Sequence, residues 1–326
     1  MKRNTYLAEA ITTAEMKAQY DAEAKKIVAD KGVLSWIVKH AVKEMKDCTL
    51  NEIANAIEDI EVARIPVYPG KSRQEAIIGM PTEDKVPNEG TVTYDVRFHV
   101  VTPKRERIKL ILNVEIQRDY YPGYDPVTRA VFYCARMLSS QLDTEFSAED
   151  YDDIKKVYSI WLCLNAPKKE ADTIVEYAIE PHIIFGGKEN GHRYDLLSVV
   201  MIGLNEESYK IKKTTLHGFL GTVFSERLKP SEKLRSLEKD YGIKTTREIK
   251  EGVGRMCNLS DGIFERGEEQ KLIELVCKKV KKGKTLEIIA QELEEETDSV
   301  AAIYEAVLNS APDYDFDRIH EIIHHE

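Results

Sequence analysis

The feature that most constrains the fold is a pair of alternating segments between Thr91 and Asp119, separated by the polar turn TPKRE. Apolar and polar residues alternate with a period of two in both segments, which predicts a β-hairpin. A symmetric hairpin centred on Arg105 pairs residue 102 with residue 108 and, by the same rule, residue 95 with residue 115. A slip of one residue would mix apolar and polar side chains on both faces, so the pattern favours this register.

The two faces of the predicted hairpin differ sharply in polarity. The apolar face holds Val92, Tyr94, Val96, Phe98 and Val100 beside Ile108, Leu110, Leu112, Val114 and Ile116. The opposite face holds Thr93, Asp95, Arg97, His99 and Val101 beside Lys109, Ile111, Asn113, Glu115 and Gln117. We therefore expect one buried face and one wet face.

Two carboxylates face each other on the wet side of this hairpin. The register places Asp95 opposite Glu115, with Cβ atoms roughly 4.5–5.5 Å apart, where like charges repel each other. A hard cation such as Mg²⁺ binds one or two carboxylates and keeps several waters. Gln117, two residues further on the same face, could orient such a water, and metal-bound water can attack a phosphodiester.

A solvated strand face is the simpler interpretation of the same residues. Arg97, Lys109 or Arg118 could neutralise either carboxylate without any metal ion. Periodicity alone favours this interpretation, and both remain open at this point.

The rest of the chain alternates helical and strand patterns around the hairpin. The patterns predict helices over residues 14–46, 50–60 and 127–142, and strands over 156–165 and 172–185. Residues 196–205 fit a strand or a buried helix. Asp125 or Thr128 could cap the helix after the hairpin, and Pro126 suits its first turn. Short helices are expected over 216–228, 231–242 and 246–259, a long amphipathic helix over 264–283, and two further helices over 285–296 and 297–309.

Composition and charge narrow the class of protein. An apolar content of 42% supports packed cores, and 326 residues suggest about two domains. No apolar run approaches the roughly 20 residues of a membrane span, and the basic N-terminus lacks the apolar segment of a signal peptide. Five scattered cysteines without a CxxC pair indicate reduced thiols. We expect a cytoplasmic protein without membrane segments.

The negative charge is concentrated at the C-terminus. Residues 284–326 contain two basic and twelve acidic side chains, a net charge of −10 that equals the charge of the whole chain. The remaining body is neutral, so a local basic groove for nucleic acid remains compatible with the composition. The predicted helix over 297–309 has no lysine or arginine, which favours protein–protein contact or plain packing over DNA reading.

The string YDV…NVEIQ resembles the core of the PD-(D/E)XK nucleases, which has an aspartate on one strand and E-x-K on the next. The match is closer to the bacterial group of recombination-promoting nucleases and transposases, in which E-x-Q replaces E-x-K. The stretches RAVFYCARMLSSQL, KVYSIWLCLNAP and MCNLSDGIFERGEEQ resemble that group in the same order. The resemblance covers most of residues 25–308.

This resemblance implies a fold and a division of the chain. The fold class is α/β, with a restriction-endonuclease-like core in which helices flank a mixed sheet. The implied parts are an N-terminal helical extension over 1–24, a nuclease-like domain over 25–220, and a helical module with an acidic tail over 221–326.

The resemblance also assigns roles to individual residues. It makes Asp95 and Glu115 ligands of Mg²⁺ or Mn²⁺ and puts Gln117 in the place of the usual lysine, whose positive charge a glutamine cannot supply. Tyr94 stands where a proline often precedes the aspartate. Glu44 is the candidate for the acidic residue that the superfamily often adds from its first helix, although a surface acid on an amphipathic helix is the commoner case.

One helix face could contact DNA near these carboxylates. Arg129, Tyr133 and Arg136 recur at spacings of four and three residues, so they share a face of the helix over 127–142. The guanidinium groups could contact backbone phosphates. Alternatively, they could pair with nearby acids, for which Asp125, Asp143 and Glu145 are candidates. The hairpin tip KRERIK could also touch phosphate, or could simply be a soluble turn.

The predicted function is Mg²⁺-dependent hydrolysis of phosphodiester bonds in DNA. One alternative is a nuclease fold that no longer cuts and acts as a DNA-binding or protein-interaction module, and another is an enzyme acting on another polyanionic substrate, such as RNA. The expected partners are DNA and, through the C-terminal helices, a second copy of the chain. No GxGxxG or GxxxxGK[ST] loop supports nucleotide binding.

Overall fold

The computed structural model describes residues 6–62, 83–86, 90–103, 108–147, 149–187, 191–314, 318–319 and 322–323. For 6–14, 83–86, 90–92 and 261–270 the description covers the backbone only. The chain forms two compact units, of which the larger is Asp21–Gly254 and the smaller combines Met1–Tyr20 with Arg255–Glu326. Most of the hairpin tip KRERIK and the final HHE lie outside the described residues.

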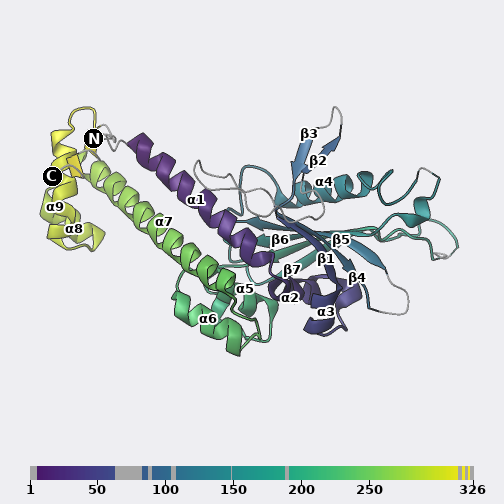
Figure 1. Cartoon of the computed structure of the whole chain (residues 1–326). Helices are drawn as coiled ribbons and strands as arrows, with labels where there is room; N and C mark the ends of the chain where they lie inside the picture. Colours follow the sequence, from purple (N-terminus) through teal and green to yellow (C-terminus); the bar gives the residue numbers. More distant parts are fainter. Residues whose placement is uncertain are drawn as a thin grey trace. The chain divides into compact units, whose positions relative to one another are not determined.

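The larger unit contains a mixed six-stranded sheet (Figure 1). Its strands are β1 (Ile57–Val62), β4 (Val96–Val101), β5 (Lys109–Gln117), β6 (Val157–Cys163), β7 (Ile174–Ala178) and β8 (Leu197–Gly203), in the order β1-β4-β5-β6-β8-β7. β5, β6 and β8 are parallel, and the remaining neighbours are antiparallel. A separate two-stranded sheet pairs β2 (Glu83–Val86) with β3 (Gly90–Thr93). The α/β class with a mixed sheet is confirmed.

Helices of the larger unit cover both faces of the sheet. They are the end of α1 (Tyr6–Val28), then α2 (Lys31–Ala41), α3 (Leu50–Ala56), α4 (Pro126–Ser139), α5 (Leu216–Phe224), α6 (Pro230–Lys239) and the start of α7 (Arg247–Val280). Short 3₁₀ turns lie at η1 (Lys43–Met45), η2 (Tyr151–Asp153) and η3 (Ser208–Lys210).

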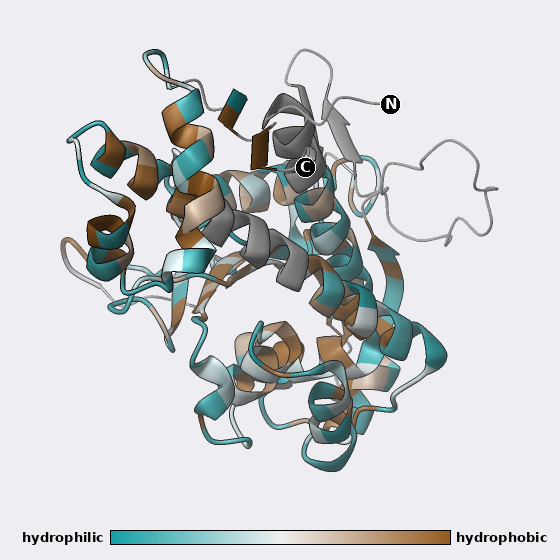
Figure 2. Cartoon of the chain, turned by 90° about the vertical axis from the view of Figure 1, so that its left-hand side faces the viewer, coloured by the Kyte–Doolittle hydropathy of each residue, from teal (hydrophilic) through white to brown (hydrophobic). Residues whose placement is uncertain are grey.

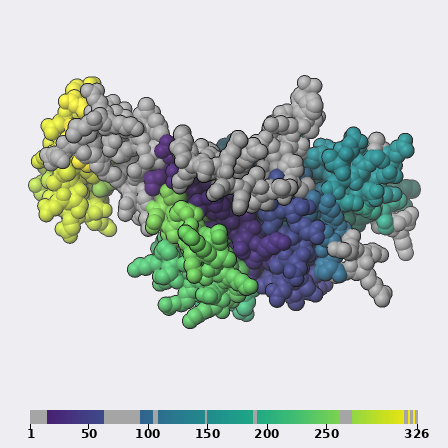
Figure 3. All heavy atoms as spheres, in the orientation of Figure 1, coloured from purple at the N-terminus to yellow at the C-terminus, as the bar shows by residue number. Residues whose placement is uncertain are grey.

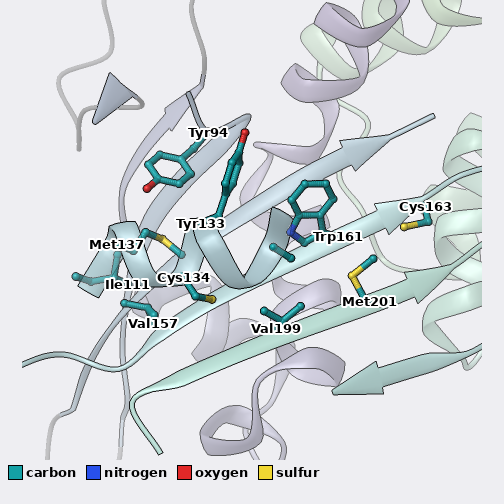
Figure 4. Close-up of a cluster of buried hydrophobic side chains, with 11 residues drawn as sticks. Tyr94, Ile111, Tyr133, Cys134, Met137, Val157, Trp161, Cys163, Val199 and Met201 are labelled. Carbon is teal, nitrogen blue, oxygen red and sulfur yellow. The ribbon is translucent and has the colours of Figure 1, made fainter. Parts of the chain in front are cut away.

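Helix α4 packs on the sheet face that the odd-numbered residues of β5 and β6 share (Figure 4). Its Tyr133, Cys134 and Met137 belong to one buried cluster with strand residues such as Ile111 and Trp161. Asp125 caps this helix through a bond from the Val127 N–H to its carboxylate, and Pro126 occupies the first turn, as predicted. The remaining cluster members include Tyr94, Ala130, Val157, Cys163, Val199 and Met201.

The opposite face is covered by α2, α5 and the turn after α2. The ring centroid of Trp36 in α2 lies 5.0 Å from that of Phe219 in α5 and 5.4 Å from that of Tyr241, which follows α6. Both helices belong to the larger unit, although the predicted boundary after residue 220 divided α5 and grouped α6 with the C-terminal module. Burial of the parallel strands on both faces is usual for such sheets.

The hairpin register is confirmed, but the wet face is not. Residues 96–101 pair with 114–109 in the predicted order. However, four residues of the polar face are each at most 5% exposed, namely Arg97, His99, Asn113 and Glu115. The expectation of a solvated face was wrong because a hairpin pattern cannot show that a later helix will cover it.

The first hairpin strand is interrupted at Tyr94 and Asp95. β3 ends at Thr93 and pairs with β2, whereas β4 begins at Val96. Tyr94 turns to the α4 side, where its ring meets Tyr133 edge-on at 5.4 Å, so its predicted place on the apolar face was wrong. This break brings the Asp95 backbone and side chain against the neighbouring strand.

Three other helix predictions need correction. Residues 14–46 form two helices rather than one, because the chain turns at Ala29 and Asp30, and Asp30 caps α2. The predicted helix over 50–60 ends at Ala56 and continues as β1. The two helices expected within 246–283 form the single helix α7. The ambiguous segment over 196–205 is a strand, β8, and the strand expected over 172–185 is confined to β7.

The start of α7 packs against the end of α1 within the larger unit. A Cβ atom on Gly252 would lie 3.3 Å from Cγ1 of Ile27, so the small residue permits close approach of the two helices. Figure 3 shows purple residues of α1 beside green residues of α7 at the surface. This contact fixes the last turns of α1 at the edge of the core.

The smaller unit has its own apolar core. The end of α7 packs with α8 (Leu286–Leu293) and α9 (Thr297–Asn309) through buried residues that include Ile273, Val276, Ile289, Val300 and Ile303. Helices in Figure 2 carry hydrophobic and hydrophilic residues on different sides, as expected of helices with one buried face. Among the helices that the structure describes, none combines the length and the apolar character required to cross a membrane.

Candidate functional site

Asp95 and Glu115 are brought together by two reciprocal hydrogen bonds between neighbouring strands. The Asp95 backbone N–H donates to Oε1 of Glu115 at 3.0 Å, and the Ile116 N–H donates to Oδ2 of Asp95 at 2.9 Å. Each carboxylate therefore replaces a backbone acceptor of the sheet at the point where the first strand is interrupted. The predicted proximity of the two acids agrees with this geometry.

Glu115 carries its charge in an unfavourable environment. Its side chain is buried under α4, and burial together with the nearby charge of Asp95 raises its pKa well above the ordinary value. Asn113 also donates to Oε1, at 2.9 Å, so both hydrogen bonds fall on one oxygen. Among the described residues, none donates a hydrogen bond to Oε2. That oxygen is free to accept a cation or a proton.

Asp95 has a cationic partner that the sequence did not indicate. Lys25, in the last turn of α1, places its Nζ 2.6 Å from Oδ1 of Asp95. The Asp95 side chain remains 15% exposed, so the pair of carboxylates is open to solvent on this side. One of the two carboxylates is therefore neutralised and the other is not.

Asp21 lies one helical turn before Lys25 and adds a third acid to this neighbourhood. Burial raises the pKa of Asp21, whereas the charges of Arg118 and Lys25 lower it and those of Asp95 and Asp119 raise it. Asp21 and Lys25 lie four residues apart on one helix face. That spacing was visible in the predicted helix over 14–46, but nothing in the sequence indicated that this face meets the hairpin.

Glu44 does not join the carboxylates. It accepts a hydrogen bond from Lys156 Nζ at 2.9 Å and one from the Tyr158 hydroxyl at 2.6 Å. Tyr158 pairs with Leu112, so it points to the sheet face opposite Glu115. The prediction that Glu44 supplies the acid of the first helix is contradicted by this placement, and Asp21 is the acid that α1 brings near the pair.

Gln117 points away from the carboxylates. Its amide donates to the backbone carbonyl of Asp119 at 2.8 Å, at the start of the loop that follows β5. It lies on the predicted strand and face. A role in orienting water would require this side chain to turn.

Arg129 and Tyr133 lie beside Glu115, as a contiguous group on α4. Arg129 Nε donates to the Tyr133 hydroxyl at 3.1 Å, and its guanidinium carbon lies 5.0 Å from the Tyr133 ring and 5.6 Å from the Trp161 ring. Arg129 also bonds the hydroxyl of Tyr124, which is exposed. The positive charge of Arg129 lowers the pKa of Glu115. Figure 4 shows Tyr133 and Trp161 on the same side of the sheet.

Arg136 is placed differently from Arg129. It is only 3% exposed, under the α4 face that packs on the sheet. A buried guanidinium cannot contact a phosphate at the surface, so Arg136 is not part of the candidate site. The shared helix face was predicted correctly, but the depth of burial along it was not.

The donor set suits a hard divalent cation. The described residues contain no group of three or more His, Cys, Asp or Glu side chains arranged to hold a metal ion. Two carboxylates nevertheless satisfy the needs of Mg²⁺ or Mn²⁺, which complete their coordination with water. Oε2 of Glu115 accepts no hydrogen bond from the described residues, so it is available as a ligand beside Asp95.

Comparison with protein-family models, with curated proteins and with solved structures gives no match to this chain. The geometry of the site and the resemblance of its motifs are therefore the basis for a function.

Proposed function

We propose that this chain is a divalent-metal-dependent nuclease that hydrolyses phosphodiester bonds in DNA. The observation that supports this proposal most directly is the hydrogen-bonded pair of Asp95 and Glu115, in which the buried acid has a raised pKa and a free oxygen. Natural proteins seldom retain a buried uncompensated charge without a functional reason. The resemblance to the PD-(D/E)XK core supports the same chemistry.

Asp95 and Glu115 would hold Mg²⁺ or Mn²⁺ through their carboxylate oxygens. When bound, such an ion supplies an activated water and offsets the charge that develops on the phosphoryl oxygens. The backbone N–H groups of Asp95 and Ile116 keep the two carboxylates in a fixed orientation. Asn113 orients Glu115 from within the strand.

Arg129 would position the phosphate next to this pair. Its guanidinium is held by Tyr124 and Tyr133 and is only partly buried, so it can reach a phosphate at low conformational cost. Gln117, once released from the Asp119 carbonyl, would hydrogen-bond the attacking water. Gln117 ends β5 and Arg129 lies in the first turn of α4, so both side chains lie next to the loop that connects these elements.

Cleavage of supercoiled plasmid tests the proposal. The full chain is incubated with plasmid and Mg²⁺ or Mn²⁺, beside Asp95→Asn and a chelator control. We expect nicking that requires the metal and is lost in the variant. Intact plasmid with every metal, or equal nicking by Asp95→Asn, contradicts the proposal. Parallel assays on RNA identify the preferred nucleic acid.

A second candidate function is DNA binding without cleavage. The contact of Lys25 with Asp95 and the bond from Gln117 to Asp119 favour it, because the first occupies an oxygen that a metal ion would bind and the second engages the amide that would orient water. In that case DNA affinity would be independent of metal ions. Measuring affinity with and without Mg²⁺ separates the two functions even if no cleavage occurs.

A further inference from the structure

Lys25 holds the one oxygen of Asp95 that the sheet leaves free. The Ile116 N–H occupies Oδ2, and Lys25 Nζ lies 2.6 Å from Oδ1. Lys25 itself is 23% exposed, so its ammonium group can move toward solvent or toward a bound anion. The lysine therefore occupies the position where a metal ion would bind Asp95.

The neighbouring lysine shows that this contact is specific to position 25. Lys26 Nζ pairs with Oε1 of Glu23 at 2.9 Å. Of the two adjacent cations, only Lys25 contacts Asp95, and its charge also reaches Asp21. The chain thus provides a matched control one residue away.

Strand β5 does not provide a cation two residues after Glu115. Gln117 is neutral, and its amide is engaged by the Asp119 carbonyl. The guanidinium of Arg129 is directed to the hydroxyls of Tyr124 and Tyr133. Lys25 is consequently the cationic group that the described residues place in direct contact with the carboxylate pair.

We propose that Lys25 is the positioning cation of this site and competes with the divalent ion for Asp95. Without metal, the lysine holds Asp95 in place and limits its repulsion of Glu115. With metal, the ammonium group leaves Oδ1 and contacts a non-bridging oxygen of the scissile phosphate. Lys25, on α1, would then supply the positive charge that Gln117 cannot. The second part of this inference rests on the proposed nuclease function, whereas the competition for Asp95 does not require catalysis.

The competition is tested by Mn²⁺ binding to the full chain, measured by calorimetry without DNA. Removing a cation next to the binding oxygen is expected to tighten Mn²⁺ binding in Lys25→Met by about fivefold or more. Lys26→Met is expected to bind Mn²⁺ like the unmodified chain. Unchanged or weaker binding by Lys25→Met, or no Mn²⁺ binding by either protein, overturns the inference.

The charge role is tested by cleavage with the same proteins. Lys25→Met is expected to lose about a hundredfold in kcat although it binds Mn²⁺ more tightly. Lys25→Arg is expected to retain most activity, and Gln117→Lys introduced into Lys25→Met is expected to restore part of it. A purely structural lysine would show no such restoration. Circular dichroism verifies folding, and Lys25→Arg keeps the test valid if the methionine variant is unfolded.

The two outcomes separate this inference from the proposed function. If the unmodified chain binds Mn²⁺ but cuts no DNA, the nuclease proposal fails and the calorimetric comparison still decides whether Lys25 competes for Asp95. If cleavage occurs and Lys25→Met cuts at the normal rate, the nuclease proposal stands and the charge role of Lys25 is wrong.

Discussion

The two faces of one sheet hold two lysine–carboxylate groups with opposite properties. On the α2 side, the Glu44 cluster consists of Glu44, Lys156, Tyr158 and Asp195, in which Lys156 Nζ bonds both acids and Tyr158 donates to the second oxygen of Glu44. On the α4 side, Glu115 accepts two hydrogen bonds on one oxygen, and no cation among the residues that the structure describes bonds to it.

The difference appears in the protonation of each group. Burial acts to lower the pKa of Lys156, but the hydrogen bonds that its ammonium group donates to Glu44 and Asp195 raise it, so the Glu44 cluster favours the charged forms. Burial and the charge of Asp95 raise the pKa of Glu115, so its site disfavours the ion. Charged groups that are all hydrogen-bonded to opposite charges stabilise a fold. A buried carboxylate without such a partner is typical of a ligand-binding or catalytic site.

The largest expected effect is on cleavage. Glu115→Gln keeps an oxygen that can accept the bonds from Asp95 and Asn113 but removes the negative charge, so we expect a loss of at least about a hundredfold in the rate of plasmid nicking. Glu44→Gln is the matched change on the other face and is expected to change the rate by less than about twofold. Similar losses in both variants would remove the distinction between the two faces.

The second effect is on stability and is expected at Glu44. Replacing Glu44 by glutamine removes one of two charge partners from the largely buried Lys156, which we expect to lower the free energy of unfolding by about 2 kcal/mol. Urea unfolding of the metal-free protein measures this change. An unchanged midpoint would show that Asp195 alone satisfies Lys156.

Part of this comparison could be predicted from the sequence. Period-two alternation gave the register of β4 and β5 correctly, because a shift of one residue would have put polar groups in the core. The proximity of Asp95 to Glu115 followed from that register. Asp125 and Pro126 gave the start of α4, because capping is a local interaction.

Contacts between distant segments could not be predicted in this way. Lys25 and Asp21 lie near the end of α1, which packs against the start of α7 and contacts the hairpin, and no local pattern encodes that packing. Glu44 was assigned to the wrong side of the sheet because its partner Lys156 lies 112 residues further along the chain. Arg129 and Arg136 share a helix face, but Arg136 is buried whereas Arg129 is partly exposed, a difference that the spacing alone does not show.

The third effect is stabilisation by metal. Mn²⁺ at ten times its dissociation constant should stabilise the unmodified chain by about 1.4 kcal/mol, since binding to the folded state alone shifts the unfolding equilibrium. Mn²⁺ should raise the free energy of unfolding of Glu44→Gln by the same amount, although that variant is less stable without metal. It should not stabilise Asp95→Asn. Thermal unfolding with and without Mn²⁺ measures these shifts. Stabilisation of Asp95→Asn equal to that of the unmodified chain would place the ion elsewhere.

The smallest expected effect is a pH-dependent increase in stability on replacing Glu115, opposite in sign to the loss expected at Glu44. The pKa of Glu115 is raised in the folded chain. Its contribution to the free energy of unfolding is therefore complete below pH 4.5, the ordinary pKa, and is lost as the pH rises through the pKa of the folded state. Glutamine does not ionise, so Glu115→Gln does not have this loss. The free energy of unfolding of the metal-free variant should therefore exceed that of the unmodified chain by about 1 kcal/mol at neutral pH. The advantage should shrink as the pH falls toward 4.5.

The pH dependence must be measured as the difference between these two proteins. Burial lowers the pKa of His99, so its contribution to stability is lost as pH falls below 6.5, which opposes the trend from Glu115. His99 is present in both proteins and cancels from the difference. If the stability difference between Glu115→Gln and the unmodified chain is constant between pH 4.5 and neutrality, Glu115 titrates normally. In that case both faces of the sheet hold satisfied carboxylates, and the contrast between them disappears.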